Sequence, residues 1–122
     1  QRGQATLLRG AIDQPWPPGS FDLVVLSEIC YYLDAATLRQ TLDREVPRLT
    51  AGATIVSAHW RHPVEDYPLT GDRATDIIGA TAGLHPLGGY RDADVVIELF
   101  DTASPLSVAA RITGSTLARI SA

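Results

Sequence analysis

The sequence predicts an α/β fold in which parallel strands alternate with helices. Residues Phe21–Ser27 hold a run of large apolar side chains without alternation, as expected for a strand covered on both faces in a parallel sheet. A helical pattern and a second apolar, β-branched run at Thr54–Trp60 follow. The whole stretch takes about 40 residues, which is the length of a strand–helix–strand crossover unit.

Two further segments precede and complete this unit. Ala5–Ala11 reads as a short strand that emerges into a loop, and Gln14–Ser20 contains three prolines and a glycine, which mark that loop. Asp34 is a good cap for a helix, and Pro47 falls near the helix end, where it stops the last turn. The apolar face of this helix repeats every three or four residues at Leu38, Leu42, Val46 and Leu49.

Beyond the crossover unit, the pattern predicts one more helix and a hairpin. Thr70–Ala82 supports a weaker helix, and Gly83 suits the residue just beyond its end. Leu84–Tyr90 and Asp94–Asp101 read as strands whose short connection fits a hairpin. We expect residues 1–101 to form the carboxy-terminal part of a single domain. Residues 102–122 are expected to form a tail that packs as a short element or stays mobile.

Composition excludes several classes of protein. The chain has 122 residues, of which 45% are hydrophobic and 20% charged, as in an ordinary globular domain. Its net charge is −4 and its basic residues are scattered, so we expect no nucleic-acid partner. No apolar stretch approaches the roughly 20 residues that cross a bilayer, so no membrane partner is expected either. A single cysteine and the absence of a secretory pattern predict a cytoplasmic location.

In an open α/β sheet, ligands bind beyond the carboxyl ends of the strands. Gly10, Ala11, Ile12 and Asp13 follow the first predicted strand, and Ser27 and Glu28 follow the second. His59, Trp60, Arg61 and His62 lie at the end of the third. A carboxylate directly after a buried run is costly unless it is paired or faces a water-filled cleft. Glu28 is therefore either a functional carboxylate or a cap for the following turn.

The two histidines do not predict a metal site. Positions three apart on a strand face opposite sides, and no third ligand follows at a recognised spacing. His59 is instead a candidate for removing a proton from an acceptor, because the pKa of imidazole lies near neutrality. A structural histidine with satisfied hydrogen bonds is the alternative. Tyr31, Tyr32 and Trp60 are candidates for an aromatic wall around a planar or cationic ligand, although core packing suits at least one tyrosine.

The segment Phe21–Leu33 resembles the fourth strand and following turn of class I S-adenosylmethionine-dependent methyltransferases. Ala51–Ala53 stands where that family often has Pro-Gly-Gly. Within the family, His59–Pro63 and Asp66–Asp72 resemble the nodulation N-methyltransferase-like (NodS-like) group. The resemblance covers residues 5–101.

This resemblance implies a Rossmann-like sheet of seven strands in the order 3-2-1-4-5-7-6, with the last strand antiparallel and helices on both faces. The present chain would supply an incomplete sheet, strands three to seven. The glycine-rich loop after strand one and the acidic residue after strand two have no counterpart here, and the chain begins at Gln1. We therefore expect a fragment that is inactive alone. Ala5–Ala11 would lack its neighbouring strand and be displaced, paired with another chain or supported by a separate piece of the protein.

The resemblance also implies S-adenosylmethionine as the cofactor and methylation of a small molecule, with a sugar amine as one acceptor. The aspartate that contacts adenine in the family aligns with Ala11, and Asp13 follows two residues later. Ser27 and Glu28 would border the methyl-donating end, and Glu28 or His59 would orient or deprotonate the amine. The residues expected to line the acceptor are Tyr31, Tyr32, Trp60, Arg61 and His62.

Other functions and partners remain open from the sequence. A noncatalytic α/β binding module that has lost the cofactor site is the main alternative, and Ala11 is the feature that favours it. Another nucleotide-binding enzyme is disfavoured because the residues contain no glycine-rich phosphate loop. Expected partners are a second copy of the chain or the missing amino-terminal segment.

Overall fold

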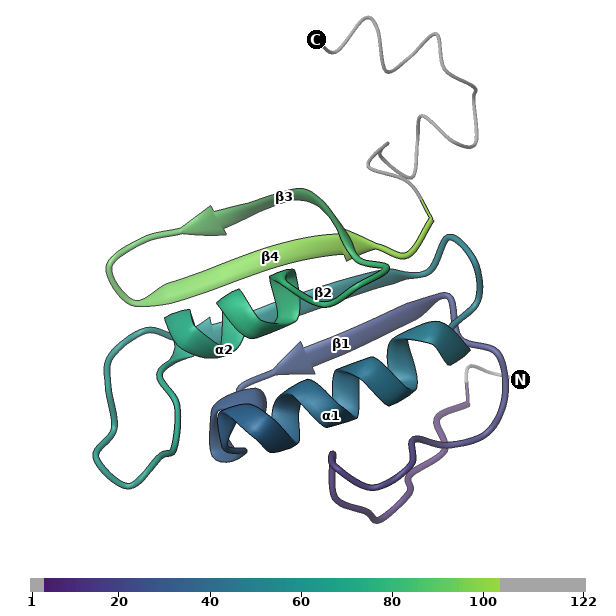
Figure 1. Cartoon of the computed structure of the whole chain (residues 1–122), viewed down its shortest axis with the longest axis horizontal. Coiled ribbons are helices and arrows are strands. Elements are labelled where there is room, and N and C mark those ends of the chain that lie inside the picture. Colours follow the sequence, from purple (N-terminus) through teal and green to yellow (C-terminus); the bar gives the residue numbers. More distant parts are fainter. Residues whose placement is uncertain (1–3, 104–122) are drawn as a thin grey trace, which may run out of the picture.

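The computed structural model describes residues 4–103, and within them a single four-stranded sheet (Figure 1). Strand β1 (Leu23–Ser27) runs parallel to β2 (Thr54–Trp60). Strand β4 (Val95–Asp101) is antiparallel to both β2 and β3 (His85–Arg91). The order β1-β2-β4-β3 matches the last four strands of the predicted sheet and confirms that the last strand is antiparallel.

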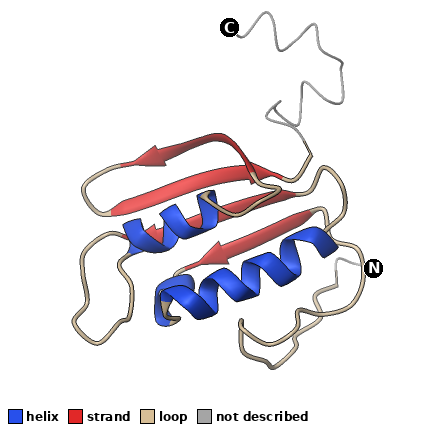
Figure 2. Ribbon diagram, in the orientation of Figure 1, coloured by secondary structure: helices blue, strands red, loops and turns tan. Residues whose placement is uncertain are grey.

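Both α-helices cover the same face of the sheet (Figure 2). Helix α1 (Ala35–Glu45) follows the 3-10 turn η1 (Cys30–Tyr32), and α2 (Gly71–Gly79) connects β2 to β3. The core lies between these helices and the sheet. It contains Leu26, Cys30, Tyr31, Leu38, Leu42, Val46, Ile55, Ala74, Ile77, Ile78, Leu84 and Phe100. Helices on both faces are expected of the complete seven-stranded sheet, and the part of it in residues 4–103 carries both α-helices on one face.

Local signals place α1 and the start of α2 as predicted, whereas α2 ends earlier than predicted. The Asp34 carboxylate accepts a hydrogen bond from the Thr37 amide at 2.8 Å and caps α1. Pro47 lies in the 3-10 turn η2 (Val46–Arg48) that ends the helix. The Thr70 hydroxyl caps α2 by accepting from the Arg73 amide at 3.0 Å. Gly83 does not directly follow α2, which stops at Gly79; with φ at 91° it forms the turn into β3 instead.

The predicted strand Ala5–Ala11 does not form: residues 4–22 contain neither helix nor strand. No neighbouring strand is present to pair with this segment, so its backbone gains nothing from an extended ladder. The loop is held at the carboxyl end of α1 instead. The Trp16 amide donates to the buried Glu45 carboxylate at 3.3 Å, and Arg44 donates to the Asp13 carbonyl at 3.1 Å. Three outcomes were expected for Ala5–Ala11: displacement, pairing with another chain, or support by a separate piece of the protein. The structure shows the segment displaced from the sheet.

Strand β1 is an exposed edge strand. Leu23 and Val25 keep 57% and 59% of their surface accessible, and only Leu26 is buried. The expectation of a strand covered on both faces is wrong in residues 4–103 because no strand lies beyond β1 and no helix covers its second face. The same residues contain no helix long and apolar enough to span a bilayer.

Replacing Gly71 with alanine is expected to destabilise the fold by about 3 kcal/mol. A Cβ atom at this position would overlap the backbone carbonyl of Trp60, and backbone at the end of β2 has little freedom to move. The free energy of unfolding in urea measures the loss. Gly79→Ala is the matched control, since its Cβ would meet Phe100 at 3.5 Å, an ordinary contact. Equal stabilities of the two variants would contradict this account.

Candidate functional site

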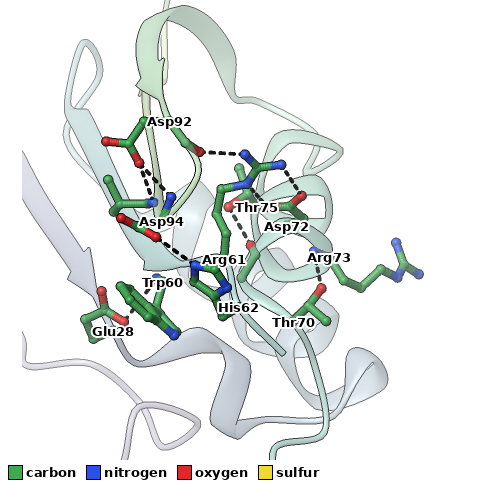
Figure 3. A network of polar contacts seen from close by, with 12 residues as sticks. Glu28, Trp60, Arg61, His62, Thr70, Asp72, Arg73, Thr75, Asp92 and Asp94 are labelled. Atoms are coloured by element: carbon green, nitrogen blue, oxygen red, sulfur yellow. Dashed lines mark hydrogen bonds and ion pairs between the residues drawn. The ribbon is translucent and has the colours of Figure 1, made fainter. Parts of the chain in front are cut away.

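The carboxyl ends of the parallel strands β1 and β2 lie side by side. Glu28, in the tight turn that follows β1, lies next to Trp60 at the end of β2 (Figure 3). The Glu28 amide donates to the Ala58 carbonyl at 2.8 Å, which continues the parallel ladder by one bond. Its φ of 55° is the only left-handed backbone angle outside glycine in residues 4–103. A bulky residue rarely adopts this conformation without support from its surroundings. The turn directs the chain from β1 into η1.

Two donors fix the Glu28 carboxylate. Its Oε1 atom accepts hydrogen bonds from the Tyr31 hydroxyl and from the Trp60 amide, the latter at 3.2 Å. Burial and the bond to Glu28 raise the pKa of Tyr31, so the phenol remains a donor. Glu28 itself is exposed. A positioned, solvent-accessible carboxylate therefore stands at the end of the parallel strands.

His59 is fully buried beneath this turn. Its Nε2 atom accepts a hydrogen bond from the Cys30 amide at 3.1 Å, so the neutral ring carries its proton on Nδ1 and donates to the Ser57 hydroxyl at 3.1 Å. Burial lowers the pKa of His59, and the charge on Glu28 opposes this only in part. The imidazole has no free lone pair for an acceptor. Of the two predicted roles, this geometry supports the structural one.

The side chain of Cys30, whose amide bonds to His59, is fully buried. Burial raises the pKa of its thiol to about 12. A thiol with this pKa is protonated at neutral pH and is a poor nucleophile.

The predicted aromatic wall has a different third member. Tyr31 stacks on Tyr67 with ring centres 5.0 Å apart, and Tyr32 meets Tyr67 edge-on at 4.6 Å. Trp60 instead lies against His62 at 4.7 Å. Tyr67 sits in a polar, proline-bearing stretch without periodicity, so no sequence pattern singled it out; its only signal was its place within the NodS-like segment Asp66–Asp72.

Arg61 and His62 connect neighbouring elements (Figure 3). The Arg61 guanidinium binds both carboxylate oxygens of Asp72 at 2.9 and 3.0 Å and donates to the Asp92 carbonyl at 2.6 Å. This pairing raises the pKa of Arg61 and lowers that of Asp72. His62 contacts the Asp94 carboxylate at 2.7 Å. These contacts tie the end of β2 to α2 and to the β3–β4 hairpin, so Arg61 has little capacity left for a ligand.

Four of the six predicted cofactor residues share one groove, and the other two lie apart from each other. Gly10, Ala11, Ile12 and Ser27 line one open groove of about 880 Å³ that runs along β1. Asp13 is held beside the last turn of α1, whereas Glu28 precedes the start of that helix. The structure therefore does not bring Asp13 to the Glu28 turn. Within residues 4–103, no three His, Cys, Asp or Glu side chains gather as ligands for a metal ion.

Stability at mildly acidic pH is expected to depend on His59. Its folded pKa lies below the ordinary value of 6.5, so the unfolded chain binds the extra proton more readily. Stability is complete above about pH 6.5 and falls as the pH drops toward the folded pKa, at no more than about 1.4 kcal/mol per pH unit for one proton. Urea unfolding of the wild type and of His59→Gln between pH 5 and 8 measures how much of the pH dependence of the unfolding free energy comes from His59. Parallel pH profiles would contradict it.

Several solved structures share this fold. A protein from Pseudomonas syringae, provisionally described as a methyltransferase, superposes with a TM-score of 0.59 at 31% identity, over 71% of this chain and 51% of that one. The N-methyltransferase NodS from Bradyrhizobium japonicum WM9, in complex with S-adenosyl-L-homocysteine, gives 0.64 at 21% identity, over 78% and 53%. The pyocyanin biosynthetic protein PhzM gives 0.56 at 14% identity, over 77% and 34%.

The chain thus spans about half the length of the first two of these proteins. No protein-family model matches the sequence, and no curated protein sequence matches it at a significant level. The shared feature is the sheet with its antiparallel last strand and the helices between its strands. The chain is structurally similar to methyltransferases, NodS among them, and has the fold of part of a methyltransferase domain.

Proposed function

We propose that this chain is part of an S-adenosylmethionine-dependent methyltransferase that acts on a small molecule, namely an amine of a sugar or oligosaccharide. The observation that carries the proposal is the Glu28 turn, a fixed carboxylate at the carboxyl ends of two parallel strands. The similarity to NodS, an N-methyltransferase solved with the demethylated cofactor, supports both the reaction and the amine.

The residues present fit one side of such a cofactor. The groove along β1 offers backbone at Gly10, Ala11 and Ile12 and the hydroxyl of Ser27, on a surface that is mostly apolar and suits a flat ring. The cofactor supplies a methyl group on a sulfonium when it is bound. The protein then has to hold the acceptor in line with that group and to exclude water.

Glu28 and His59 take different parts in this proposal. The Glu28 carboxylate orients the acceptor amine, because it is exposed at the strand ends and held by Tyr31 and Trp60. His59 is a positioning residue: it accepts from the Cys30 amide and so holds the turn that presents Glu28. Trp60 supplies its backbone amide to the same carboxylate.

The exposed edge of β1 is the surface where the rest of the catalytic domain would associate. Leu23 and Val25 leave apolar surface exposed on β1, and the unpaired backbone groups of this edge strand are a template for another strand. The chain spans only about half of the solved proteins it resembles. We therefore favour an amino-terminal segment of the same protein as the partner over a second copy of this chain.

A noncatalytic α/β module is the second candidate. The observation that favours it is the placement of Asp13 beside Arg44, away from the Glu28 turn. In such a module the groove along β1 would bind another polypeptide and no cofactor.

Cofactor binding separates these candidates. Residues 1–122 alone are expected to bind S-adenosylhomocysteine at least about 100-fold more weakly, or roughly 2.7 kcal/mol, than a longer chain that includes the preceding segment. Isothermal titration calorimetry on both proteins measures the difference. Tight binding by residues 1–122 would contradict the proposed division of the site, and no binding by either protein would favour the noncatalytic module.

Val25→Lys tests the β1 edge directly. A lysine at this exposed position is expected to leave the isolated chain folded but to prevent association with a separately produced amino-terminal segment, because its charge would be buried in the interface. Analytical ultracentrifugation reports the association, with Gln40→Lys on the exposed side of α1 as the control. Association that survives in the Val25 variant, or self-association of the wild type through this edge, would contradict the assignment.

A further inference from the structure

We propose that Glu28, Tyr32 and Tyr67 form a recognition site for a protonated amine, which gives up one proton to the free Oε2 atom of Glu28 before its nitrogen takes the methyl group. This inference rests on the proposed function and deepens it by naming the chemical state of the substrate. It adds Tyr67, which lies 35 residues from Tyr32 in the sequence. In the fold, the hydroxyl groups of these two tyrosines are 3.1 Å apart.

The charge of Glu28 is available to a ligand. Both donors that reach its carboxylate bind the same oxygen, Oε1. Among the residues that the structure describes, none donates to Oε2, and no lysine, arginine or histidine forms an ion pair with Glu28. The carboxylates of Asp72 and Glu45, in contrast, are each paired with arginine. An exposed carboxylate with one oxygen unused attracts a cation and repels an anion.

Aromatic rings stand beside this carboxylate. Tyr31 links the two parts of the site, since its hydroxyl bonds to Glu28 and its ring stacks on Tyr67. Tyr32 lies edge-on to both of the other rings and keeps 52% of its surface exposed. Ring faces next to a carboxylate favour ammonium groups, because the ring quadrupole and the negative charge act in the same direction.

Tyr31 and Tyr67 stay neutral, so their contribution to the attraction comes from the ring faces, beside the charge of Glu28. The bond to Tyr32 and partial burial raise the pKa of Tyr67, and burial raises that of Tyr31. The site is also rigid. The Tyr67 amide donates to the Val64 carbonyl at 3.0 Å, and the Leu69 amide donates to the Tyr31 carbonyl at 3.3 Å, which ties the loop that carries Tyr67 to η1. A ligand would meet groups already in place.

The remaining ligand chemistries fit less well. One carboxylate does not make a metal site, and within residues 4–103 no three His, Cys, Asp or Glu side chains gather as ligands for a metal ion. A carboxylate or phosphate ligand would meet Glu28 without a compensating cation. A neutral sugar would leave the charge unused. A primary ammonium matches both the free Oε2 atom and the half-exposed ring of Tyr32.

The test is an NMR titration of the full 122-residue chain, without any cofactor, with glucosamine at about pH 6, where its amine is protonated. Shifts are expected at the Trp60 amide and at the ring protons of Tyr32 and Tyr67. N-acetylglucosamine, which has the same ring without the charge, is expected to bind at least about tenfold more weakly. Equal affinity for the two sugars, or shifts elsewhere only, would overturn the proposal.

Three variants assign the contributions. Glu28→Gln keeps an oxygen for Tyr31 and Trp60 but removes the charge, and it is expected to reduce the preference for glucosamine about tenfold. Tyr32→Leu removes the ring and should weaken binding, whereas Tyr32→Phe should retain it. Asp43→Asn on the exposed side of α1 removes an equal charge elsewhere and serves as the control. An unchanged preference in Glu28→Gln, or an equal loss in Asp43→Asn, would overturn the assignment.

The outcome is separable from that of the proposed function. Selective glucosamine binding by this chain, together with no methyl transfer by the longer protein, would uphold the cation site and refute the methyltransferase. Methyl transfer by the longer protein, together with equal binding of the two sugars by this chain, would uphold the methyltransferase and refute the cation site.

Discussion

The hydrogen bond from the Cys30 amide to the buried His59 ring is the contact on which the site depends. It joins the turn after β1 to the adjacent parallel strand, because Cys30 begins η1 and His59 lies near the end of β2. Without it, a buried backbone donor would lose its partner, which costs about 1–3 kcal/mol. The left-handed backbone of Glu28 sits between β1 and this contact and is stabilised from both sides.

This arrangement explains why a histidine that looks catalytic in the sequence is structural in the fold. The position of His59 at a strand terminus is what a general base requires, and it is also what a buried acceptor for a neighbouring turn requires. The catalytic and the structural role differ in whether the Nε2 atom of His59 is free or already accepts a hydrogen bond. The partner, the Cys30 amide, lies 29 residues from His59 in the sequence, so no sequence pattern indicates this hydrogen bond.

Much of the fold was predictable because its signals are local. Asp34 and Thr70 cap helices through amides three residues ahead, and the β3–β4 hairpin follows from two strand patterns joined by a short turn. The sheet order came from resemblance, and the antiparallel β4 confirms it. Within the site, Ser27, Glu28 and the tyrosines that follow them were placed correctly at the end of β1, since a strand end is a local property.

The features that sequence reasoning missed depend on distant parts of the chain. Ala5–Ala11 has the composition of a strand, yet strand formation needs a neighbour, and the segment lies exposed outside the sheet. The side chains of β1 read as buried on both faces because their composition suits the interior of a larger sheet. Tyr67 joins the site through contacts with η1 that no spacing rule describes. Residues 104–122, expected to form most of the tail, lie outside the described part of the chain.

In the sheet, β4 lies between β2 and β3 although it follows both in sequence, and this order affects the folding pathway. In the described sheet β4 is bonded on both sides, to β2 and to β3, whereas β3 pairs with β4 alone. The hairpin closes between residues close together in sequence, but β4 reaches β2 across α2 and the whole of β3, so the hairpin contacts are the faster to form. We therefore expect β3 and β4 to dock onto β2 as a preassembled ribbon, with Arg61 holding the hairpin turn once it arrives.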